Sequence, residues 1–217
     1  MNSNDPNDYR SEARAQQYLG RAGRLPHRTE GEAVLLELLP ARLNRVLDIG
    51  CGDGRLLALL LAAHPESQGL ALDFSPPMLS AARRRFGDDP RVALLEHNLN
   101  QPLPELGRFD AVVSSFAIHH LPDERKCGIY REAFACLQPG GIFCNLEHVT
   151  SPSRELHEEF YWAIGTPPAE EDPANLLTAA ETQLAWLRAI GYHKVDCYWK
   201  WREFALLAGV VPNPTGG

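Results

Sequence analysis

The chain alternates between short apolar runs and longer helix-like segments, and this alternation constrains its fold more than any other feature. Short runs rich in Val, Ile and Leu that stop at turn residues are typical of buried strands. The strand-like runs are Arg45–Ile49, Gly69–Leu72, Val92–Leu95, Ala111–Ser115 and Ile142–Leu146, and the helical segments are Leu56–Ala63, Pro76–Phe86 and Asp123–Leu137. Strands that alternate with helices predict a doubly wound, mostly parallel α/β sheet.

The alternation ends near the C-terminus. A helix is expected at Ala180–Ile190, with Gly191 as its terminator. Two strand-like runs follow, Lys194–Trp199 and Glu203–Val210, with too few residues between them for a crossover helix. They should therefore pair as an antiparallel hairpin, which completes a sheet of about seven strands.

Two further regions lie outside the alternating core of the sequence. Residues 1–44 have a polar start and two expected helices, at Tyr9–Leu19 and from His27 to about Leu39. Residues 150–178 are rich in Pro, Glu and Asp but contain adjacent aromatic residues, so we expect an ordered lid and not a linker. Because the chain shows no repeat or second composition, we interpret residues 1–217 as one domain.

Composition excludes several classes of protein. The net charge is −7, from 21 Lys and Arg against 28 Asp and Glu, which makes nucleic acid an unfavoured partner. Five cysteines without a Cys-x-x-Cys pair fit neither a disulfide framework nor a zinc site. The longest uncharged apolar stretch, Leu56–His64, is far too short to cross a bilayer, and the polar N-terminus lacks a signal-peptide core. We therefore expect a cytoplasmic protein without contact to membranes.

The most informative local feature is the glycine-rich turn that follows the first strand-like run, Val46-Leu47-Asp48-Ile49-Gly50-Cys51-Gly52-Asp53-Gly54. Glycines at alternate positions allow a tight turn and a close approach to a ligand. The spacing differs from the G-x-G-x-x-G pattern of dinucleotide sites, and its two aspartates would repel a pyrophosphate. Their carboxylates would instead attract a cofactor that carries an ammonium and a sulfonium.

This Asp-x-Gly-x-Gly arrangement resembles motif I of the class I S-adenosylmethionine-dependent methyltransferases, and the resemblance extends from about Arg45 to Gly209. It implies S-adenosylmethionine as cofactor and S-adenosylhomocysteine as product. In that family an acidic residue that closes the second strand binds both ribose hydroxyls, and Asp73 matches this position. Asn98 stands where the family usually has an Asp that accepts from the adenine amino group, and an amide oxygen can accept the same bond. The cofactor-binding residues that the resemblance implies are Asp48, Gly50, Cys51, Gly52, Gly54, Asp73, Phe74, Met78, Asn98, Leu99 and Ser115.

Candidate catalytic residues should lie at the carboxyl ends of the strands, where open α/β sheets bind their ligands. His119 and His120 follow the fourth strand, and Glu147 and His148 follow the fifth. His119, Glu147 or His148 could serve as general base for a hydroxyl or amine acceptor, although packing and helix entry equally explain the paired histidines. The four side chains include metal-ligand types, but neighbours on a strand point to opposite sides, so we predict no metal site.

The acceptor pocket is the least determined part of the site. In many relatives the N-terminal segment covers the cofactor, which places Tyr9, Tyr18 and Arg28 near it, and Arg28 could pair with the cofactor's carboxylate. Three consecutive aromatics, Phe160-Tyr161-Trp162, are too many for one buried helix face, so at least one should line a pocket or an interface. We expect Tyr18, Tyr161 and Trp162 to contact the substrate.

These features predict a methyltransferase that acts on a small-molecule acceptor, with O-, N- and S-methylation all open. One alternative is a cofactor-modifying enzyme, because Phe116–Gly141 is loosely similar to carboxy-S-adenosylmethionine synthases. Another is a nonenzymatic, cofactor-binding partner subunit, since no single residue is a compelling catalytic base. The negative charge argues against a nucleic-acid methyltransferase. The chain is expected to be a monomer or a homodimer.

Overall fold

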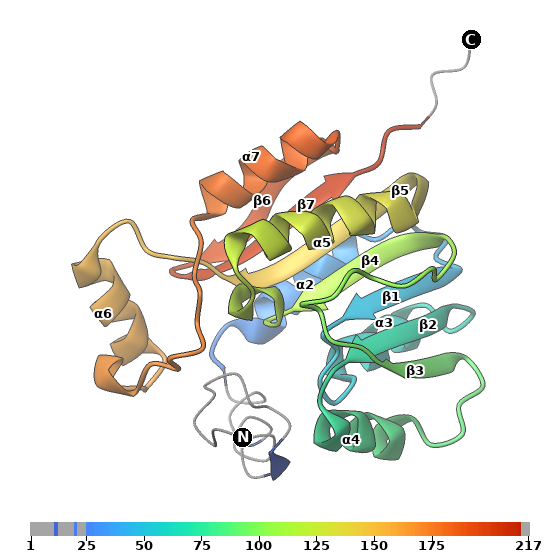
Figure 1. The fold of residues 1–217 in the computed structure, drawn as a ribbon, viewed down its shortest axis with the longest axis horizontal. Coiled ribbons are helices and arrows are strands. Elements are labelled where there is room, and N and C mark those ends of the chain that lie inside the picture. Colours follow the sequence, from blue (N-terminus) through green and yellow to red (C-terminus); the bar gives the residue numbers. More distant parts are fainter. Residues whose placement is uncertain (1–10, 13–19, 21–24, 214–217) are drawn as a thin grey trace.

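A computed structural model describes residues 11–12, 20 and 25–213 of the chain (Figure 1). Within these residues the strands form one seven-stranded sheet of order β3-β2-β1-β4-β5-β7-β6. The strands are β1 (Arg45–Ile49), β2 (Gln68–Asp73), β3 (Val92–Glu96), β4 (Phe109–Ser115), β5 (Leu137–His148), β6 (His193–Trp201) and β7 (Phe204–Val210). The first five pair in parallel, and β7 runs antiparallel to both of its neighbours. The predicted mostly parallel sheet with an antiparallel C-terminal hairpin is thus confirmed.

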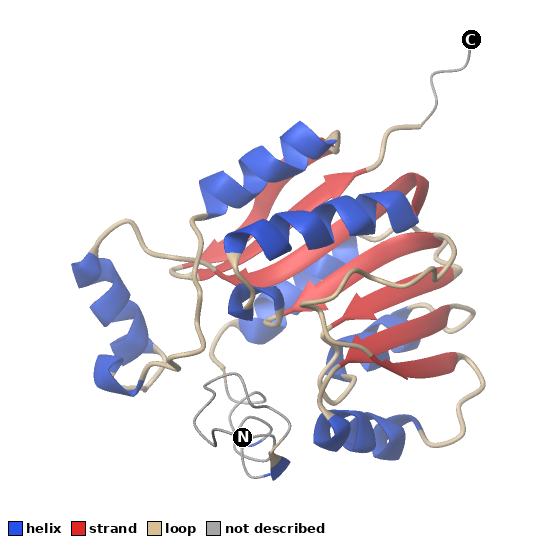
Figure 2. Ribbon diagram, viewed as in Figure 1, coloured by secondary structure: helices blue, strands red, loops and turns tan. Residues whose placement is uncertain are grey.

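Helices cover both faces of the sheet, which gives three layers (Figure 2). The helices are α2 (Arg28–Leu38), α3 (Arg55–Ala63), α4 (Pro76–Phe86), α5 (Asp123–Cys136), α6 (Arg154–Ala163) and α7 (Ala180–Ile190), with short 3-10 turns η1 (Ile118–His120) and η2 (Pro168–Glu170). Side chains of α2 and α3 pack on one face, and those of α5 and α7 pack on the other. The helix expected at Tyr9–Leu19 lies outside the described residues.

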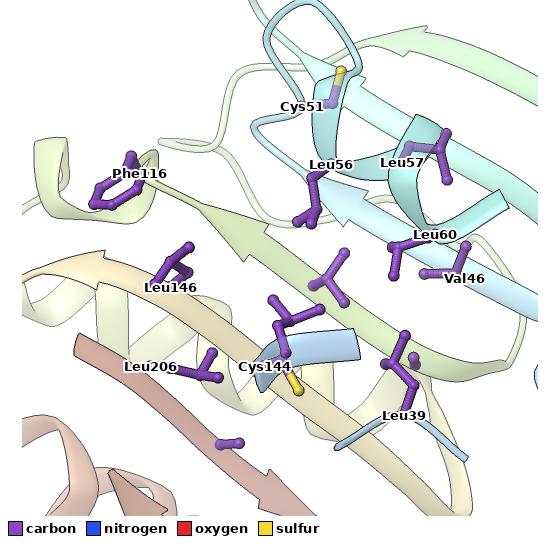
Figure 3. Close-up of a cluster of buried hydrophobic side chains, with 14 of the residues drawn as sticks. Leu39, Val46, Cys51, Leu56, Leu57, Leu60, Phe116, Cys144, Leu146 and Leu206 are labelled. Atoms are coloured by element: carbon purple, nitrogen blue, oxygen red, sulfur yellow. The ribbon is translucent and has the colours of Figure 1, made fainter. Parts of the chain in front are cut away.

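Alternate residues of β1 enter two separate hydrophobic cores. Val46 belongs to the core beneath α2 and α3, which Figure 3 shows, whereas Leu47 and Ile49 belong to the core beneath α5 and α7. All three side chains are completely buried. A strand that is covered on both faces must be apolar on both, and this explains why the sequence reads as continuous apolar runs.

The order of strands reverses at β1, which lies between β2 and β4. In open α/β sheets such a reversal opens a crevice beyond the carboxyl ends of the strands. In Figure 1 the arrowheads of β1, β2 and β4 point towards the side of the molecule on which α6 stands. The fold therefore directs the turns that follow β1, β2, β4 and β5 to one edge of the sheet.

Strand β5 is longer than the sequence predicts. We expected a helix as far as Leu137 and a strand from Ile142, but Leu137 already pairs with Phe109 of β4, across an irregularity in the register. Gly140 has a positive φ of 78°, and its N–H donates to the carbonyl of Val211. The glycines therefore bend the strand without ending its pairing.

A buried lysine fixes the end of the 150–178 segment to α5. Lys126 is 1% exposed, and its Nζ donates to Asp123 Oδ1 (3.0 Å), Thr178 Oγ1 (2.6 Å) and the carbonyl of Leu176. The backbone N–H of Leu176 also donates to the carbonyl of His119, at 3.0 Å. A charge in such a place is tolerated only when its donors are satisfied, so this part of the segment is held in one position.

We expect Lys126→Met to lower the free energy of unfolding by about 2–4 kcal/mol, because the methionine leaves the Thr178 hydroxyl and the Leu176 carbonyl without their charged donor. Urea unfolding measures this loss, and limited proteolysis should cut within residues 150–178 faster than in the wild type. Arg131→Met is the control, since Arg131 lies on the same helix but is exposed. Equal stability of the two variants would contradict the assigned role of Lys126.

Candidate functional site

The turn after β1 has the backbone conformation that glycine permits. Gly50, Gly52 and Gly54 have φ values of 69°, 55° and 78°, in the left-handed region. A Cβ on Gly50 would lie 2.3 Å from the Cβ of Ala117, and one on Gly54 would lie 2.4 Å from the Phe86 ring. A Cβ on Gly52 would meet nothing within 4 Å. Gly50 and Gly54 thus leave room for Ala117 and Phe86, whereas the space beside Gly52 is open to a ligand.

Asp48 is a buried carboxylate without a partner. Its side chain lies in β1 and is 1% exposed, and neither oxygen has a hydrogen bond to any described residue. The pKa of Asp48 is raised to about 7, chiefly by burial and also by the negative charge of Asp73, while the backbone N–H of Leu57 and the charge of Arg28 offset part of the rise. An orphaned buried carboxylate is costly, and a cationic ligand group beside it would remove that cost. This observation fits an ammonium or sulfonium group well.

Asp73, the last residue of β2, ties together two turns at the same edge. Its Oδ2 accepts from the N–H of Gly52 at 2.8 Å, and its Oδ1 accepts from the N–H of Ser75, also at 2.8 Å. The carboxylate is 8% exposed, and burial raises its pKa. A carboxylate has about four acceptor sites, so two remain for a pair of vicinal hydroxyls.

Three apolar or thiol side chains surround these turns. Phe74 is half-buried after β2, and Met78 is 3% exposed in the first turn of α4. Cys51 is buried in the glycine turn, as Figure 3 shows, and burial raises the pKa of its thiol well above the ordinary range. Cys51 is therefore a packing residue of the turn and not a nucleophile.

The turn after β3 holds two more of the predicted cofactor-binding residues, Asn98 and Leu99. Leu99 is buried at 8% exposure, whereas Asn98 is exposed. The Asn98 Oδ1 accepts from both the backbone N–H (3.0 Å) and the Nδ2 (3.2 Å) of Asn100, so the amide stabilises its own turn. Asn98 thus lies at the same edge of the sheet as the turns after β1 and β2, but its side-chain oxygen already accepts two hydrogen bonds from Asn100.

Arg28 brings a positive charge to the carboxyl end of β4. It is 6% exposed at the start of α2, its Nη2 donates to Ser115 Oγ at 3.4 Å, and its Nε donates to Glu32 Oε1 at 2.9 Å. Its guanidinium lies 5.4 Å from the centroid of the Phe116 ring. Glu32 also accepts two bonds from Arg55, at 2.9 and 2.7 Å. Glu32 was not predicted as a site residue, because its spacing of four residues from Arg28 is common on exposed helices.

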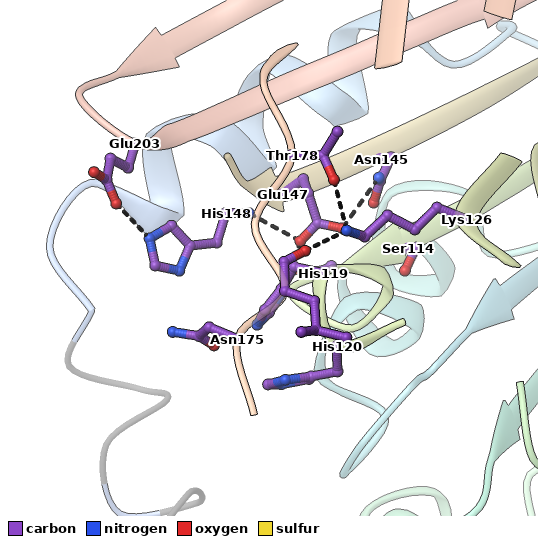
Figure 4. Close-up of polar contacts among 12 residues, drawn as sticks. Ser114, His119, His120, Lys126, Asn145, Glu147, His148, Asn175, Thr178 and Glu203 are labelled. Carbon is purple, nitrogen blue, oxygen red and sulfur yellow. Dashed lines mark hydrogen bonds and ion pairs between the residues drawn. The ribbon is translucent and has the colours of Figure 1, made fainter. Parts of the chain in front are cut away.

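A second group of polar side chains lies where β4 and β5 end (Figure 4). His119, in η1, contacts Glu147 through its Nδ1 and the Oε1 of the glutamate, at 2.6 Å. Glu147 is 1% exposed and also accepts from the N–H of His148 (2.9 Å) and from Asn145 Nδ2 (3.2 Å). Burial raises the pKa of Glu147 to about 7 and lowers the pKa of His119 well below its ordinary value, with nearby His148 and Lys126 adding to the latter shift. The structure thus joins two of the predicted catalytic residues.

His148 faces a different partner. Its Nε2 contacts Glu203 Oε2 at 2.8 Å, and the other oxygen of Glu203 contacts Nδ1 of His157 at 2.9 Å. The rings of His148 and His119 have centroids 5.7 Å apart. Glu203 and His157 were not predicted, because the first lies in a hairpin turn and the second on a helix with no strand-end position to mark it.

The three consecutive aromatics of α6 have three different environments. Phe160 is completely buried and packs edge-on against Phe204, with ring centroids 5.0 Å apart. Tyr161 is 3% exposed, and its ring centroid is 6.3 Å from that of His148. Trp162 is 65% exposed. Phe160 and Tyr161 therefore both lie beside His148 of the polar cluster, with ring centroids 5.0 and 6.3 Å from its ring. Tyr9 and Tyr18 lie outside the described residues.

The described parts of the chain contain neither a metal centre nor a membrane-spanning helix. No group of three or more His, Cys, Asp or Glu side chains there is arranged to hold a metal ion. No helix there is long and apolar enough to span a membrane.

Several known proteins with a similar sequence or structure are named methyltransferases. Residues 46–141 match the model of a methyltransferase domain. The chain is 35% identical over 196 residues to a trans-aconitate 2-methyltransferase of Methylobacterium nodulans, covering 82% of this chain and 67% of that protein. An O-methyltransferase family protein of Burkholderia thailandensis has a similar fold, with a TM-score of 0.74 at 21% identity over 95% of this chain and 62% of that one.

Another relative is matched over a shorter length. An uncharacterized methyltransferase of Mycobacterium tuberculosis is 36% identical over 123 residues, which cover 57% of this chain. The matched part spans 60% of that relative. The methyltransferase-domain match, at residues 46–141, includes the glycine turn and the carboxyl ends of β1, β2, β3 and β4.

The raised pKa of Asp48 predicts a pH-dependent effect of removing its charge. Since the folded value of about 7 lies above the ordinary 3.8, the folded state binds more protons between about pH 4 and 7, and stability falls as the pH rises through this window. Asp48→Asn removes this dependence. The variant should exceed the wild type in unfolding free energy by up to about 4 kcal/mol at pH 8, and by less at pH 5.

Urea unfolding of the ligand-free protein at the two pH values measures this difference. Asp88→Asn is the control, because Asp88 is exposed on the loop between α4 and β3. A difference between Asp48→Asn and wild type that is independent of pH would show that Asp48 is not destabilised by its charge.

Proposed function

Because the chain belongs to the class I S-adenosylmethionine-dependent methyltransferases, we propose that it transfers a methyl group from S-adenosylmethionine to a small-molecule acceptor. The observation that carries this proposal is the buried, unpartnered carboxylate of Asp48 beside the open face of Gly52 and the spare acceptor sites of Asp73. Together these three residues fit a ligand that has both a positive charge and vicinal hydroxyls.

Each residue on the cofactor side of the site has its own role in binding. Asp48 attracts the cationic end of the cofactor, Asp73 accepts from the ribose hydroxyls, and Arg28 pairs with the carboxylate. Gly52 allows the close approach of the backbone. When bound, S-adenosylmethionine supplies a methyl group that is already activated on its sulfonium, so the protein needs to align the acceptor and exclude water.

The acceptor side holds a candidate general base. When Glu147 is ionised it accepts from Nδ1–H of His119, which leaves the Nε2 of that ring with a lone pair. Burial lowers the pKa of His119, so the ring is neutral at neutral pH and its Nε2 lone pair is free of a proton; a weak base of this kind can accept the proton that a hydroxyl or an amine releases as it is methylated. We therefore assign His119 as the base and Glu147 as the group that orients it.

Two observations support a small acceptor over a nucleic acid. The net charge of −7 disfavours a polyanion. The similar protein of Methylobacterium nodulans is named for methylation of trans-aconitate, a small molecule. The acceptor atom stays open between oxygen, nitrogen and sulfur.

Isothermal titration with S-adenosylmethionine and S-adenosylhomocysteine tests the cofactor assignment, and absence of binding at millimolar ligand would contradict it. Asp73→Ala should weaken binding by about 1.5–3 kcal/mol, or roughly 10- to 150-fold, because the ribose loses a charged acceptor. Asp88→Ala should bind as the wild type does. Equal affinity of all three proteins would show that the ribose is held elsewhere.

Release of S-adenosylhomocysteine, measured against panels of phenols, amines, thiols and carboxylates, tests the transfer itself. With a hydroxyl or amine acceptor, His119→Gln should lower kcat by about 10²- to 10⁴-fold, because the proton loses its acceptor, while cofactor affinity stays within about twofold. His193→Gln, on the exposed part of β6, is the control. Equal kcat values for the two variants would remove His119 from the reaction.

A further inference from the structure

Glu203 is a completely buried carboxylate that connects three parts of the molecule. It lies directly before β7, in the turn of the C-terminal hairpin. One of its oxygens contacts His148 at the end of β5, and the other contacts His157 of α6, at 2.8 and 2.9 Å. Burial raises the pKa of Glu203, but hydrogen bonds from His148, Ser151 and His157 outweigh it and lower the pKa overall. Glu203 is therefore ionised and acts only as an acceptor.

An acceptor-only partner determines which nitrogen of His148 carries the proton. Neutral imidazole has one N–H and one lone pair. Since Nε2 faces the carboxylate, the proton must lie on Nε2 and the lone pair on Nδ1. Within the described chain Nδ1 of His148 has no hydrogen-bonding partner, and the ring lies edge-on to that of His119. In Figure 4 one ring nitrogen of His148 contacts Glu203, and the second nitrogen points away from Glu203.

The other histidine is held between two carboxylates. The Nδ1 of His157 contacts Glu203, and its Nε2 contacts Glu171 Oε2 at 3.2 Å, just after η2. The ring of Tyr161 packs edge-on against it, with centroids 4.9 Å apart. Two carboxylate acceptors require both ring nitrogens to donate. In agreement, hydrogen bonds to Glu203 and Glu171 raise the pKa of His157, although partial burial opposes them.

We propose that Glu203 is a positioning residue that couples helix α6 to the acceptor side of the active site: one oxygen orients the ring of His148, and the other holds α6 through His157. The proposal rests on the proposed function, because it assigns His148 to the acceptor side. Its consequence is that the Nδ1 lone pair of the neutral His148 ring is available to accept a hydrogen bond from the methyl-acceptor substrate.

Long-range ¹H–¹⁵N spectra of the imidazole rings test this assignment without a known acceptor. They are recorded on the full chain saturated with S-adenosylhomocysteine, between pH 6 and 8.5, and His148→Gln and His157→Gln assign the two signals. In the wild type we expect the single proton of the neutral His148 ring to lie on Nε2. A proton on Nδ1 of His148 in the wild type would overturn the proposal.

Two substitutions of Glu203 separate its two contacts. Glu203→Gln keeps one oxygen as an acceptor for His148 but offers no charge to His157, so the His157 titration midpoint should fall by at least about one pH unit while the His148 tautomer persists. Glu203→Ala removes both contacts, and His148 should then populate both tautomers. An unchanged midpoint for His157 in the first variant, or a single Nε2–H tautomer for His148 in the second, would contradict the proposal.

Glu159→Gln is the matched control. Glu159 pairs with Arg202 at 3.3 Å and so links the same helix to the same hairpin turn, but it is exposed and contacts neither histidine. Amide hydrogen exchange of residues 154–163 at pH 7 should rise about tenfold or more in Glu203→Gln and by less than about threefold in Glu159→Gln. Equal exchange in the two variants would show that Glu203 does not hold α6.

These readouts are independent of the proposed reaction. If the wild type fails to bind S-adenosylhomocysteine, the proposed function fails, and the same spectra of the ligand-free chain still decide the role of Glu203. Should Glu203→Ala not fold, as judged by circular dichroism, the wild-type tautomer and the Glu203→Gln titration decide it. Once an acceptor is found, Glu203→Gln should raise its KM more than Glu159→Gln does, with cofactor affinity unchanged.

Discussion

Five neighbouring parallel strands, covered by helices on both faces, leave this molecule one edge on which to arrange polar chemistry. The apolar residues of the strands fill two cores. Polar side chains are therefore concentrated at the carboxyl ends of β1, β2, β4 and β5 and in the turns that follow them, where the strands end side by side. Residues that are far apart in the sequence, such as Gly52, Asp73 and Ser115, share this edge because the order of strands reverses at β1.

Three buried carboxylates of the site, Glu203, Glu147 and Asp48, are stabilised to different degrees, and the differences indicate what each one does. Glu203 has a histidine on each oxygen, and its pKa is lowered. Glu147 has three donors yet keeps a pKa of about 7, because burial dominates. Asp48 has none among the described residues. The charge of Glu203 is thus satisfied within the protein, whereas the charge of Asp48 requires a ligand.

Most of the fold follows from the sequence, because buried parallel strands and the helices between them leave clear periodic signals. The helix Pro76–Phe86 and the strand Arg45–Ile49 begin and end where the pattern predicts. The long start of β5 was not predictable, since Pro139 and two glycines indicate a turn, and only pairing with Phe109 and Val211 shows a bent strand. At the site, motif spacing identified Asp48 and Asp73. Glu203 and His157 left no such signal, because their chemistry depends on the packing of a hairpin turn against a distant helix.

The position of Glu203 along the chain separates the two sides of the site in sequence. The turns of the cofactor side follow β1 and β2, whereas Glu203 lies in the hairpin between β6 and β7. Pairing of β7 with β5 sets His148 opposite Phe204, the residue after Glu203. His148 and His157 therefore share a carboxylate that the hairpin supplies, and a substitution confined to that hairpin alters the acceptor side while the residues of the cofactor side stay unchanged.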